Sequence, residues 1–103
     1  MFHIFRQRKT ITMPVLLQKL NKGRPVVGDV RERSEYEAGH LKGVRNVPLK
    51  ELNQLSLAND TPVYVLCQSG KRSKQAYKTL EKKGMIVLDV EGGMNTYKGR
   101  VVK

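Results

Sequence analysis

The chain has 103 residues, which is the length of one domain with a modest hydrophobic core. Hydrophobic residues make up 39% of it and the charges are mixed along the sequence, so the composition excludes an intrinsically disordered chain. The formal charge is +11, from 20 Lys and Arg against 9 Asp and Glu, and such a positive field attracts anions of any kind.

The basic excess is concentrated at the start of the chain. Residues 1–28 contain no acid and six bases, namely Arg6, Arg8, Lys9, Lys19, Lys22 and Arg24. Nucleic acid, an anionic membrane, an acidic partner and a small oxyanion all fit this charge, as does simple solubility. The four Tyr and two Phe form no pattern for stacking bases, and the usual nucleic-acid motifs are missing, so no nucleic-acid partner is expected.

Cys67 is the only cysteine, which excludes an intrachain disulfide and a multi-cysteine metal site, and no metal is expected. A lone thiol suits a reducing compartment, and no apolar run is long enough to span a membrane. The first residues have too short an apolar stretch for a secretory signal, so we expect the cytoplasm. Phe2, Ile4 and Phe5 are compatible with contact at a membrane surface, but they favour an ordinary first strand.

The first clear pattern in chain order is a helix between two strands. Residues 11–12 close a short strand, Thr12 is suited to cap the helix, and Pro14 fits its first turn. The apolar face of this helix is formed by Leu16, Leu17 and Leu20. Gly23 ends the helix, and residues 25–30 then predict a buried strand.

The middle of the chain predicts two short helices and two strands. Ser34 is expected to cap a helix that ends at Gly39, and residues 44–47 form a short strand. A small helix follows, with the apolar spacing of Leu49, Leu52 and Leu55. Residues 62–66 are the clearest strand in the chain.

The last part of the chain predicts a helix from residue 73 to about 83, with Ala76, Tyr77 and Leu80 facing inward. Residues 85–90 form the last strand, and residues 94–97 form a helical turn. Short apolar strands separated by helices predict an α/β fold with a mostly parallel sheet covered on both faces. Ligands bind at the carboxyl ends of such strands, where Cys67 and residues 29–31 are expected.

The order of strand, cysteine, glycine-containing loop and helix is typical of a reactive cysteine. The first N–H groups of a helix are unpaired and lie at the positive end of its dipole. Gly70 permits the tight turn that directs several N–H groups toward one point. Lys71, Arg72 and Lys74 add positive charge. These features favour the thiolate form of Cys67, which is the nucleophile.

Two other interpretations of this loop stay open on the residues alone. A free cysteine is often a buried structural residue, although one that ends a strand is not usually followed by Gln-Ser-Gly-Lys-Arg-Ser. The loop geometry also suits a phosphate. Cysteine phosphatases place five residues between Cys and Arg around a tetrahedral oxyanion, whereas four residues separate Cys67 from Arg72. The smaller ring favours a single sulfur atom held on the cysteine.

Four stretches in the same order resemble the rhodanese family, between about residues 10 and 99. They are residues 27–31 (Val-Gly-Asp-Val-Arg), 35–48 (Glu-Tyr-Glu-Ala-Gly-His-Leu-Lys-Gly-Val-Arg-Asn-Val-Pro), 63–73 (Val-Tyr-Val-Leu-Cys-Gln-Ser-Gly-Lys-Arg-Ser) and 88–94 (Leu-Asp-Val-Glu-Gly-Gly-Met). Each stretch alone is a weak match, but four in order are specific. Gly28 and Tyr97 depart from the family, in which a larger apolar residue and a Trp are usual.

The resemblance implies that residues 1–103 form a single rhodanese-like domain, a three-layer sandwich with a central sheet of about five strands. It implies a sulfurtransferase that moves sulfane sulfur from thiosulfate or a protein persulfide to cyanide or a thiol, such as thioredoxin or a low-molecular-weight thiol. The sulfur is carried as a persulfide on Cys67, without a cofactor. The active-site loop is formed by Gln68, Ser69, Gly70, Lys71 and Arg72. The alternative is a non-catalytic protein-binding module of the same fold.

Supporting roles are expected for several polar residues around the loop. Asp29 and Arg31 fix neighbouring loops by hydrogen bonds and ion pairing, and Arg31 is also a candidate for the pocket wall. Lys71 either binds an anionic donor or is a solvated lysine. Arg72 either steers anions or pairs with a carboxylate at the base of the loop. His40 is expected to be a structural turn residue rather than a catalytic base.

Overall fold

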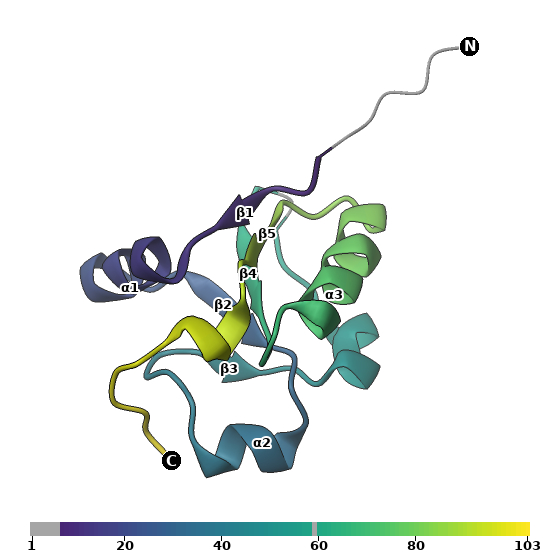
Figure 1. The fold of residues 1–103 in the computed structure, drawn as a ribbon. Coiled ribbons are helices and arrows are strands. Elements are labelled where there is room, and N and C mark those ends of the chain that lie inside the picture. Colours follow the sequence, from purple (N-terminus) through teal and green to yellow (C-terminus); the bar gives the residue numbers. More distant parts are fainter. Residues whose placement is uncertain (1–6, 59) are drawn as a thin grey trace.

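The computed structural model of the protein describes residues 7–58 and 60–103. The first strand expected around Phe2, Ile4 and Phe5 lies outside these residues. Within them, five strands form one sheet: β1 (Thr10–Ile11), β2 (Val26–Asp29), β3 (Arg45–Asn46), β4 (Val63–Leu66) and β5 (Val87–Val90). Their spatial order is β1-β5-β4-β2-β3, and every neighbouring pair is parallel (Figure 1). The predicted α/β fold with a parallel central sheet is confirmed.

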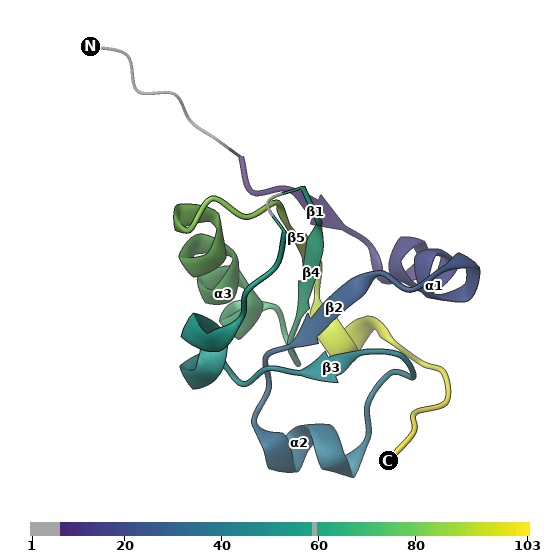
Figure 2. The same ribbon diagram turned by 180° about the vertical axis from the view of Figure 1, so that it is seen from behind.

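Helices cover both faces of the sheet, which gives the three expected layers. The helix α1 (Met13–Lys22) lies on one face, and α3 (Lys71–Lys82) lies on the other with the 3-10 helix η1 (Leu49–Gln54) (Figures 1 and 2). The helix α2 (Arg33–Ala38) lies beyond the carboxyl end of β2, and the 3-10 turn η2 (Gly93–Thr96) follows β5. Parallel strands need helical crossovers, and these crossovers bury the sheet.

Each face of the sheet has its own apolar cluster. On the α1 face, Met13 and Leu16 pack with Tyr64 and Leu66 of β4. On the α3 face, the cluster includes Ala76, Tyr77, Leu80, Val63 and Val65. All four residues of β4 are buried, because this strand lies in the middle of the sheet and alternate side chains enter the two clusters. The buried position of Tyr77 agrees with the inward-facing place expected for it.

Of the two N-terminal caps predicted, the structure confirms one and corrects the other. The Oγ1 atom of Thr12 accepts a hydrogen bond from the N–H of Val15 at 3.5 Å, so Thr12 caps α1 as expected. The prediction that Ser34 caps α2 is wrong, because Ser34 lies inside the helix and Glu32 is its N-cap. The N–H of Glu32 donates to Oε1 of Glu35 at 3.0 Å, a capping arrangement that a search for short Ser or Thr caps misses.

The third helix begins two residues earlier than predicted. Gly70 is the N-cap of α3, with a φ of +103°, so Lys71 and Arg72 belong to its first turn rather than to the loop. This backbone angle lies in the left-handed region that favours glycine. The turn into the helix is therefore completed within the three residues after Cys67.

The two departures from the family pattern are accommodated in the fold. Gly28 is buried in β2, and a Cβ atom at this position would have its nearest neighbour, Cγ2 of Val47, at 3.9 Å. Tyr97 packs against the α1-face cluster, and its hydroxyl donates to the carbonyl of Arg100 at 2.5 Å. In the described part of the chain, no helix is long and apolar enough to cross a membrane.

Candidate active site

The predicted site residues lie at the carboxyl ends of two neighbouring strands. Cys67 directly follows β4, and Arg31 follows β2, which ends at Asp29. Asp29 is paired with Leu66 in the sheet, so both strands end at the same level. The parallel sheet therefore brings together two segments that are more than thirty positions apart in the sequence.

The Cys67 loop (residues 67–70) curls around the sulfur atom of its first residue. The N–H of Gly70 donates a hydrogen bond to Sγ of Cys67 at 2.9 Å, and Oγ of Ser73 lies 3.5 Å from the same sulfur. The next N–H groups, at the start of α3, have no acceptor within the helix. The Cys67 side chain is fully buried, with 0% of its surface exposed. The sulfur atom is thus enclosed by its own loop at the positive end of a helix dipole.

The turn η2 supports the Cys67 loop from below. The N–H of Met94 donates to the carbonyl of Cys67 at 2.8 Å, and the N–H of Asn95 donates to the carbonyl of Gln68 at 2.9 Å. Gly93 makes this approach possible, because a Cβ atom there would overlap the carbonyl oxygen of Cys67. Its φ of +59° also suits glycine. Two backbone hydrogen bonds therefore hold the Cys67 loop in place without a contribution from side chains.

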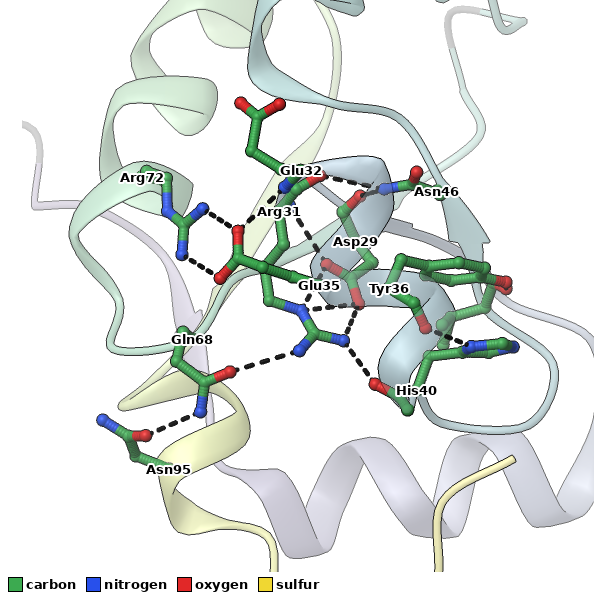
Figure 3. Close-up of polar contacts among 12 residues, drawn as sticks. Asp29, Arg31, Glu32, Glu35, Tyr36, His40, Asn46, Gln68, Arg72 and Asn95 are labelled. Carbon is green, nitrogen blue, oxygen red and sulfur yellow. Dashed lines mark hydrogen bonds and ion pairs between the residues drawn. The ribbon is translucent and has the colours of Figure 1, made fainter. Parts of the chain in front are cut away.

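Arg31 links the Cys67 loop to its surroundings (Figure 3). The guanidinium donates to Asp29 through Nε at 3.0 Å and Nη2 at 2.8 Å, and also to the carbonyl of Gly39 at 2.9 Å. Its Nη1 donates to Oε1 of Gln68 at 3.2 Å, and Nε2 of Gln68 donates in turn to Oδ1 of Asn95 at 2.7 Å. Asp29 is fully buried and Arg31 is 4% exposed. This geometry agrees with the loop-fixing role expected for Asp29 and Arg31.

Arg72 pairs with Glu35 of α2, which is one of the two roles expected for this arginine. Its Nη1 and Nη2 atoms lie 2.5 and 3.0 Å from the two carboxylate oxygens (Figure 3). The hydrogen bond from Arg72 lowers the pKa of Glu35 from 4.5 to about 2. The same contact raises the pKa of Arg72. Both side chains remain about one-third exposed, so this pair ties α3 to α2 in partial contact with water.

A hollow of about 350 Å³ opens beside the Cys67 loop. Its lining includes Ser69 and Gly70 of the loop, together with three basic residues and the two acidic residues Asp89 and Glu91; the basic residues are Arg8, Lys71 and Lys74. Lys71 and Lys74 are exposed, so the basic charge expected near the loop faces solvent. The hollow thus brings two lysines and two acidic residues together next to the Cys67 loop.

A buried carboxylate forms part of the same hollow. Asp89 of β5 is 2% exposed, and Nε of Arg8 lies 2.9 Å from its Oδ2 atom. Burial raises the pKa of Asp89. No sequence signal marks Asp89 as a neighbour of the loop, because an Asp inside an apolar strand has no pattern that places it there.

His40 lies in a structural contact. Its ring stacks on Tyr36 with ring centroids 3.6 Å apart, and Nδ1 lies 2.8 Å from the carbonyl oxygen of Tyr36. Its backbone pairs with Val102 through two hydrogen bonds. Burial raises the pKa of Tyr36, whose hydroxyl donates to the carbonyl of Val44. These contacts fix a turn and the end of the chain.

Besides Asp89, three partners of the site residues were missed from the sequence: Glu35, Ser73 and Asn95. Glu35 and Ser73 lie within stretches that show the family resemblance, but the sequence position of neither residue indicates which residue it contacts. Asn95 follows the Gly-Gly pair and meets Gln68 only because η2 folds back under the loop. The chain has nine acidic residues, and nothing in the sequence marks one of them as the partner of Arg72.

Comparisons with known proteins identify the family of the chain. The sequence matches the family model for the rhodanese-like domain over residues 12–100. The protein YqhL of Bacillus subtilis (strain 168) is 36% identical over 104 residues, which cover 96% of this chain and 81% of YqhL. YrkF of the same organism, named as a candidate sulfur carrier protein, is 34% identical over 94 residues. That match covers 87% of this chain and 51% of YrkF, so this chain spans about half of that relative.

A solved structure gives the same result for the fold. The crystal structure of a rhodanese-like domain protein from Staphylococcus aureus matches with a TM-score of 0.80 and 31% sequence identity. The match covers 87% of this chain and 91% of that protein. The resemblance inferred from four short stretches is confirmed by these comparisons.

Proposed function

Because the chain belongs to the rhodanese-like family of sulfur-transfer domains, we propose that it is a sulfurtransferase that carries sulfane sulfur as a persulfide on Cys67. The observation that supports this most directly is the hydrogen bond from the N–H of Gly70 to Sγ of Cys67, at 2.9 Å, at the N-terminus of α3. A backbone donor and a helix dipole that meet at one sulfur atom stabilise negative charge on it.

In the first step, the thiolate of Cys67 attacks the outer sulfur of the donor. The S–S bond of the donor breaks, and its electron pair leaves with sulfite if the donor is thiosulfate, or with a thiolate if the donor is a protein persulfide. The product is a persulfide anion on Cys67. Two electrons enter the new S–S bond and two leave with the departing group, so no external oxidant is needed.

In the second step, an acceptor takes the outer sulfur and releases the thiolate of Cys67. The acceptor is cyanide, which becomes thiocyanate, or a thiolate such as that of thioredoxin or a low-molecular-weight thiol, which becomes a persulfide. The loop N–H groups and the helix dipole stabilise the anion in both steps, an effect of the oxyanion-hole type. A reducing compartment such as the cytoplasm suits this cycle, because it keeps Cys67 and the acceptor thiol reduced.

The surrounding side chains have different tasks in this proposal. Lys71 attracts an anionic donor to the rim of the hollow. Arg31 positions Gln68, and Arg72 anchors the start of α3 through Glu35. Arg31 and Arg72 act through the loop and are positioning residues.

The burial of Cys67 predicts selectivity for small donors. Its Sγ atom is enclosed, whereas the outer sulfur of a persulfide extends about 2 Å further along the S–S bond. A small reagent such as methyl methanethiosulfonate should therefore label Cys67 faster than a bulky aromatic disulfide does. Equal labelling rates, after correction for the rates with free cysteine, would contradict an enclosed site.

The decisive experiment measures thiocyanate formed from thiosulfate and cyanide, with the unmodified protein beside Cys67→Ser. We expect activity in the first and background in the second, because a serine hydroxyl forms no persulfide. Intact mass after thiosulfate treatment should show one added sulfur atom, and only where Cys67 is present. A protein that forms no thiocyanate and gains no sulfur would contradict transfer from thiosulfate.

Two further arms separate the remaining interpretations. A protein persulfide donor replaces thiosulfate, and a mass gain only with that donor would restrict the function to protein-to-protein transfer. A chain that gains sulfur from neither donor would favour the non-catalytic binding module. Hydrolysis of an aryl phosphate that depends on Cys67 would revive the phosphatase interpretation, which the four-residue spacing between Cys67 and Arg72 disfavours.

A further inference from the structure

The face of the sheet covered by α1 carries two neighbouring hollows that the proposed sulfur-transfer site does not use. The larger, of about 660 Å³, lies between α1, the start of β2 and the turn at residues 41–45. The smaller, of about 580 Å³, borders α1 along residues 15–22. Both are lined by Gly23, Arg24 and Pro25, so the two hollows adjoin at this short segment, which directly follows α1. We refer to the two hollows together as the α1 groove.

Every charged side chain that lines the α1 groove is basic. These side chains are Lys19, Lys22, Arg24, Lys42, Arg45 and Arg100. All six are exposed, and within the described residues none of them is in an ion pair. They come from three separate parts of the chain, which the fold brings to one face. The groove thus accounts for half of the basic excess noted at the start of the sequence, namely Lys19, Lys22 and Arg24.

The floor of the α1 groove is apolar. Leu17, Leu20 and Leu41 line the larger hollow, while Val15 and the ring of Tyr64 line the smaller one. Val15 is 40% exposed, which makes it one of the exposed large apolar side chains of the described chain. An apolar floor with a polar rim is the usual composition of a protein interaction site.

We propose that the α1 groove binds an acidic amphipathic helix of a partner protein. The matching surface is an apolar stripe flanked by carboxylates, and a helix with apolar residues three and four positions apart presents such a stripe. The stripe fills the two hollows, and the carboxylates meet the bases on the rim. The positive field of the rim also speeds the encounter with an acidic partner.

The other anionic partners fit these features less well. A small oxyanion needs donors that converge on one point, whereas the six bases are spread around a long rim. Single-stranded nucleic acid stacks its bases on exposed aromatic rings, but Tyr64 in the floor is only 8% exposed. The helix α1, which borders the groove, lies on the opposite face of the sheet from α3 (Figure 2). A partner bound along α1 therefore leaves α3, which begins at the Cys67 loop, uncovered.

The probe for this proposal is a fluorescent synthetic peptide, measured by fluorescence anisotropy with the full chain. The peptide carries Leu at helical spacing with Glu on both flanks of the stripe. A scrambled peptide of identical composition keeps the charge but loses the stripe. We expect the amphipathic peptide to bind roughly tenfold more tightly than the scrambled one, because only the first fills the apolar floor. Binding should weaken as salt increases.

Matched variants of the protein locate the binding face. Arg24→Glu with Arg45→Glu reverses two rim charges, while Lys78→Glu with Lys82→Glu makes the same net change on exposed positions of α3. Arg24→Glu with Arg45→Glu should weaken peptide binding roughly tenfold, since several exposed charge pairs between rim and peptide change from attraction to repulsion. The pair of substitutions on α3 should weaken peptide binding much less. Val15→Ser tests the floor and should also weaken binding. Circular dichroism confirms that each variant is folded.

Several outcomes would overturn the proposal. Equal binding of the scrambled peptide would mean that charge alone attracts it. An equal loss of peptide affinity in the two charge-reversal variants would mean that the peptide binds no particular face of the protein. Tighter binding of a single-stranded oligonucleotide or of anionic lipid vesicles, lost with Arg24→Glu and Arg45→Glu, would assign the groove to that class instead. Thiocyanate formation is measured separately, so failure of the sulfur-transfer proposal does not affect this test.

Discussion

The Arg31–Asp29 and Arg72–Glu35 pairs lie at the same edge of the sheet, and in each an arginine contacts a carboxylate through two nitrogen atoms. Solvent reaches them very differently. The side chains of Arg31 and Asp29 are 5% and 0% exposed, whereas those of Arg72 and Glu35 are 35% and 34% exposed. Two similar ion pairs beside the Cys67 loop thus lie in different environments, one buried and one partly exposed.

The difference shows how burial changes the task of an ion pair. A buried pair costs desolvation energy, and removal of one partner leaves an uncompensated charge. The Arg31 pair also holds Gln68 and the carbonyl of Gly39, so the Cys67 loop and α2 depend on it. The Arg72 pair is screened by water and joins two helices at the surface. We infer that the Arg31–Asp29 pair determines the shape of the site, while the Arg72–Glu35 pair makes a small contribution to stability.

The largest effect is expected for Arg31→Ala. Loss of the guanidinium leaves the Asp29 carboxylate buried without its partner, so the free energy of unfolding should fall by about 3–5 kcal/mol. Urea denaturation followed by circular dichroism measures this change. A double variant, Asp29→Leu with Arg31→Met, removes both charges and should be less destabilised than Arg31→Ala. A double variant as unstable as the single one would show that packing, rather than the unpaired charge, dominates.

A smaller effect is expected for Arg31→Lys. Lysine keeps the positive charge but cannot reach Asp29, Gly39 and Gln68 together, because it lacks the planar fork of a guanidinium. We expect a loss of about 1–3 kcal/mol in the free energy of unfolding. Thiocyanate formation should fall as well, since Gln68 loses its anchor beside Cys67. Unchanged activity with reduced stability would separate the stabilising role of Arg31 from any role in the site.

The exposed pair predicts a modest dependence of stability on pH. The pKa of Glu35 lies at about 2 in the folded protein and at 4.5 without its contacts, so its contribution is present above pH 4.5. It is lost as the pH falls from 4.5 toward 2, because the carboxylate becomes protonated. With one-third exposure, the contribution should reach at most about 1 kcal/mol. Denaturation midpoints of the unmodified protein and Glu35→Gln should therefore converge as the pH falls. A constant difference across this range would contradict the assignment.

The smallest effect is expected for Glu51→Gln. Its ion pair with Arg33 joins atoms 3.5 Å apart, and the two side chains are 32% and 68% exposed. The free energy of unfolding should change by less than about 0.5 kcal/mol. This variant is the surface reference for the other three. A loss as large as that of Arg31→Lys would mean that exposure does not rank the ion pairs of this protein.

The sequence was a good guide to elements whose signal is local. The run from Val63 to Leu66 is apolar throughout and forms the central strand β4. Thr12 and Pro14 predicted the start of α1, because a capping hydroxyl and a fixed φ act within one turn. The cap of α2 was placed wrongly at Ser34, since the Glu32 and Glu35 arrangement uses a longer side chain. Gly70 started α3 earlier than the spacing of its apolar residues suggested.

The sequence by itself determined the alternation of strands and helices, the lone cysteine before a glycine-containing turn, and the resemblance to the rhodanese family. These features depend on neighbours within a few residues. Only the tertiary structure decided that Glu35 takes Arg72, that Asn95 and Arg31 hold Gln68, and that six bases surround one groove. Each of these contacts joins segments far apart in the chain, and which partners meet depends on the order of the strands and the packing of helices against them. Local sequence patterns do not specify that order. Charged residues that look alike in the sequence therefore have different roles in the folded protein.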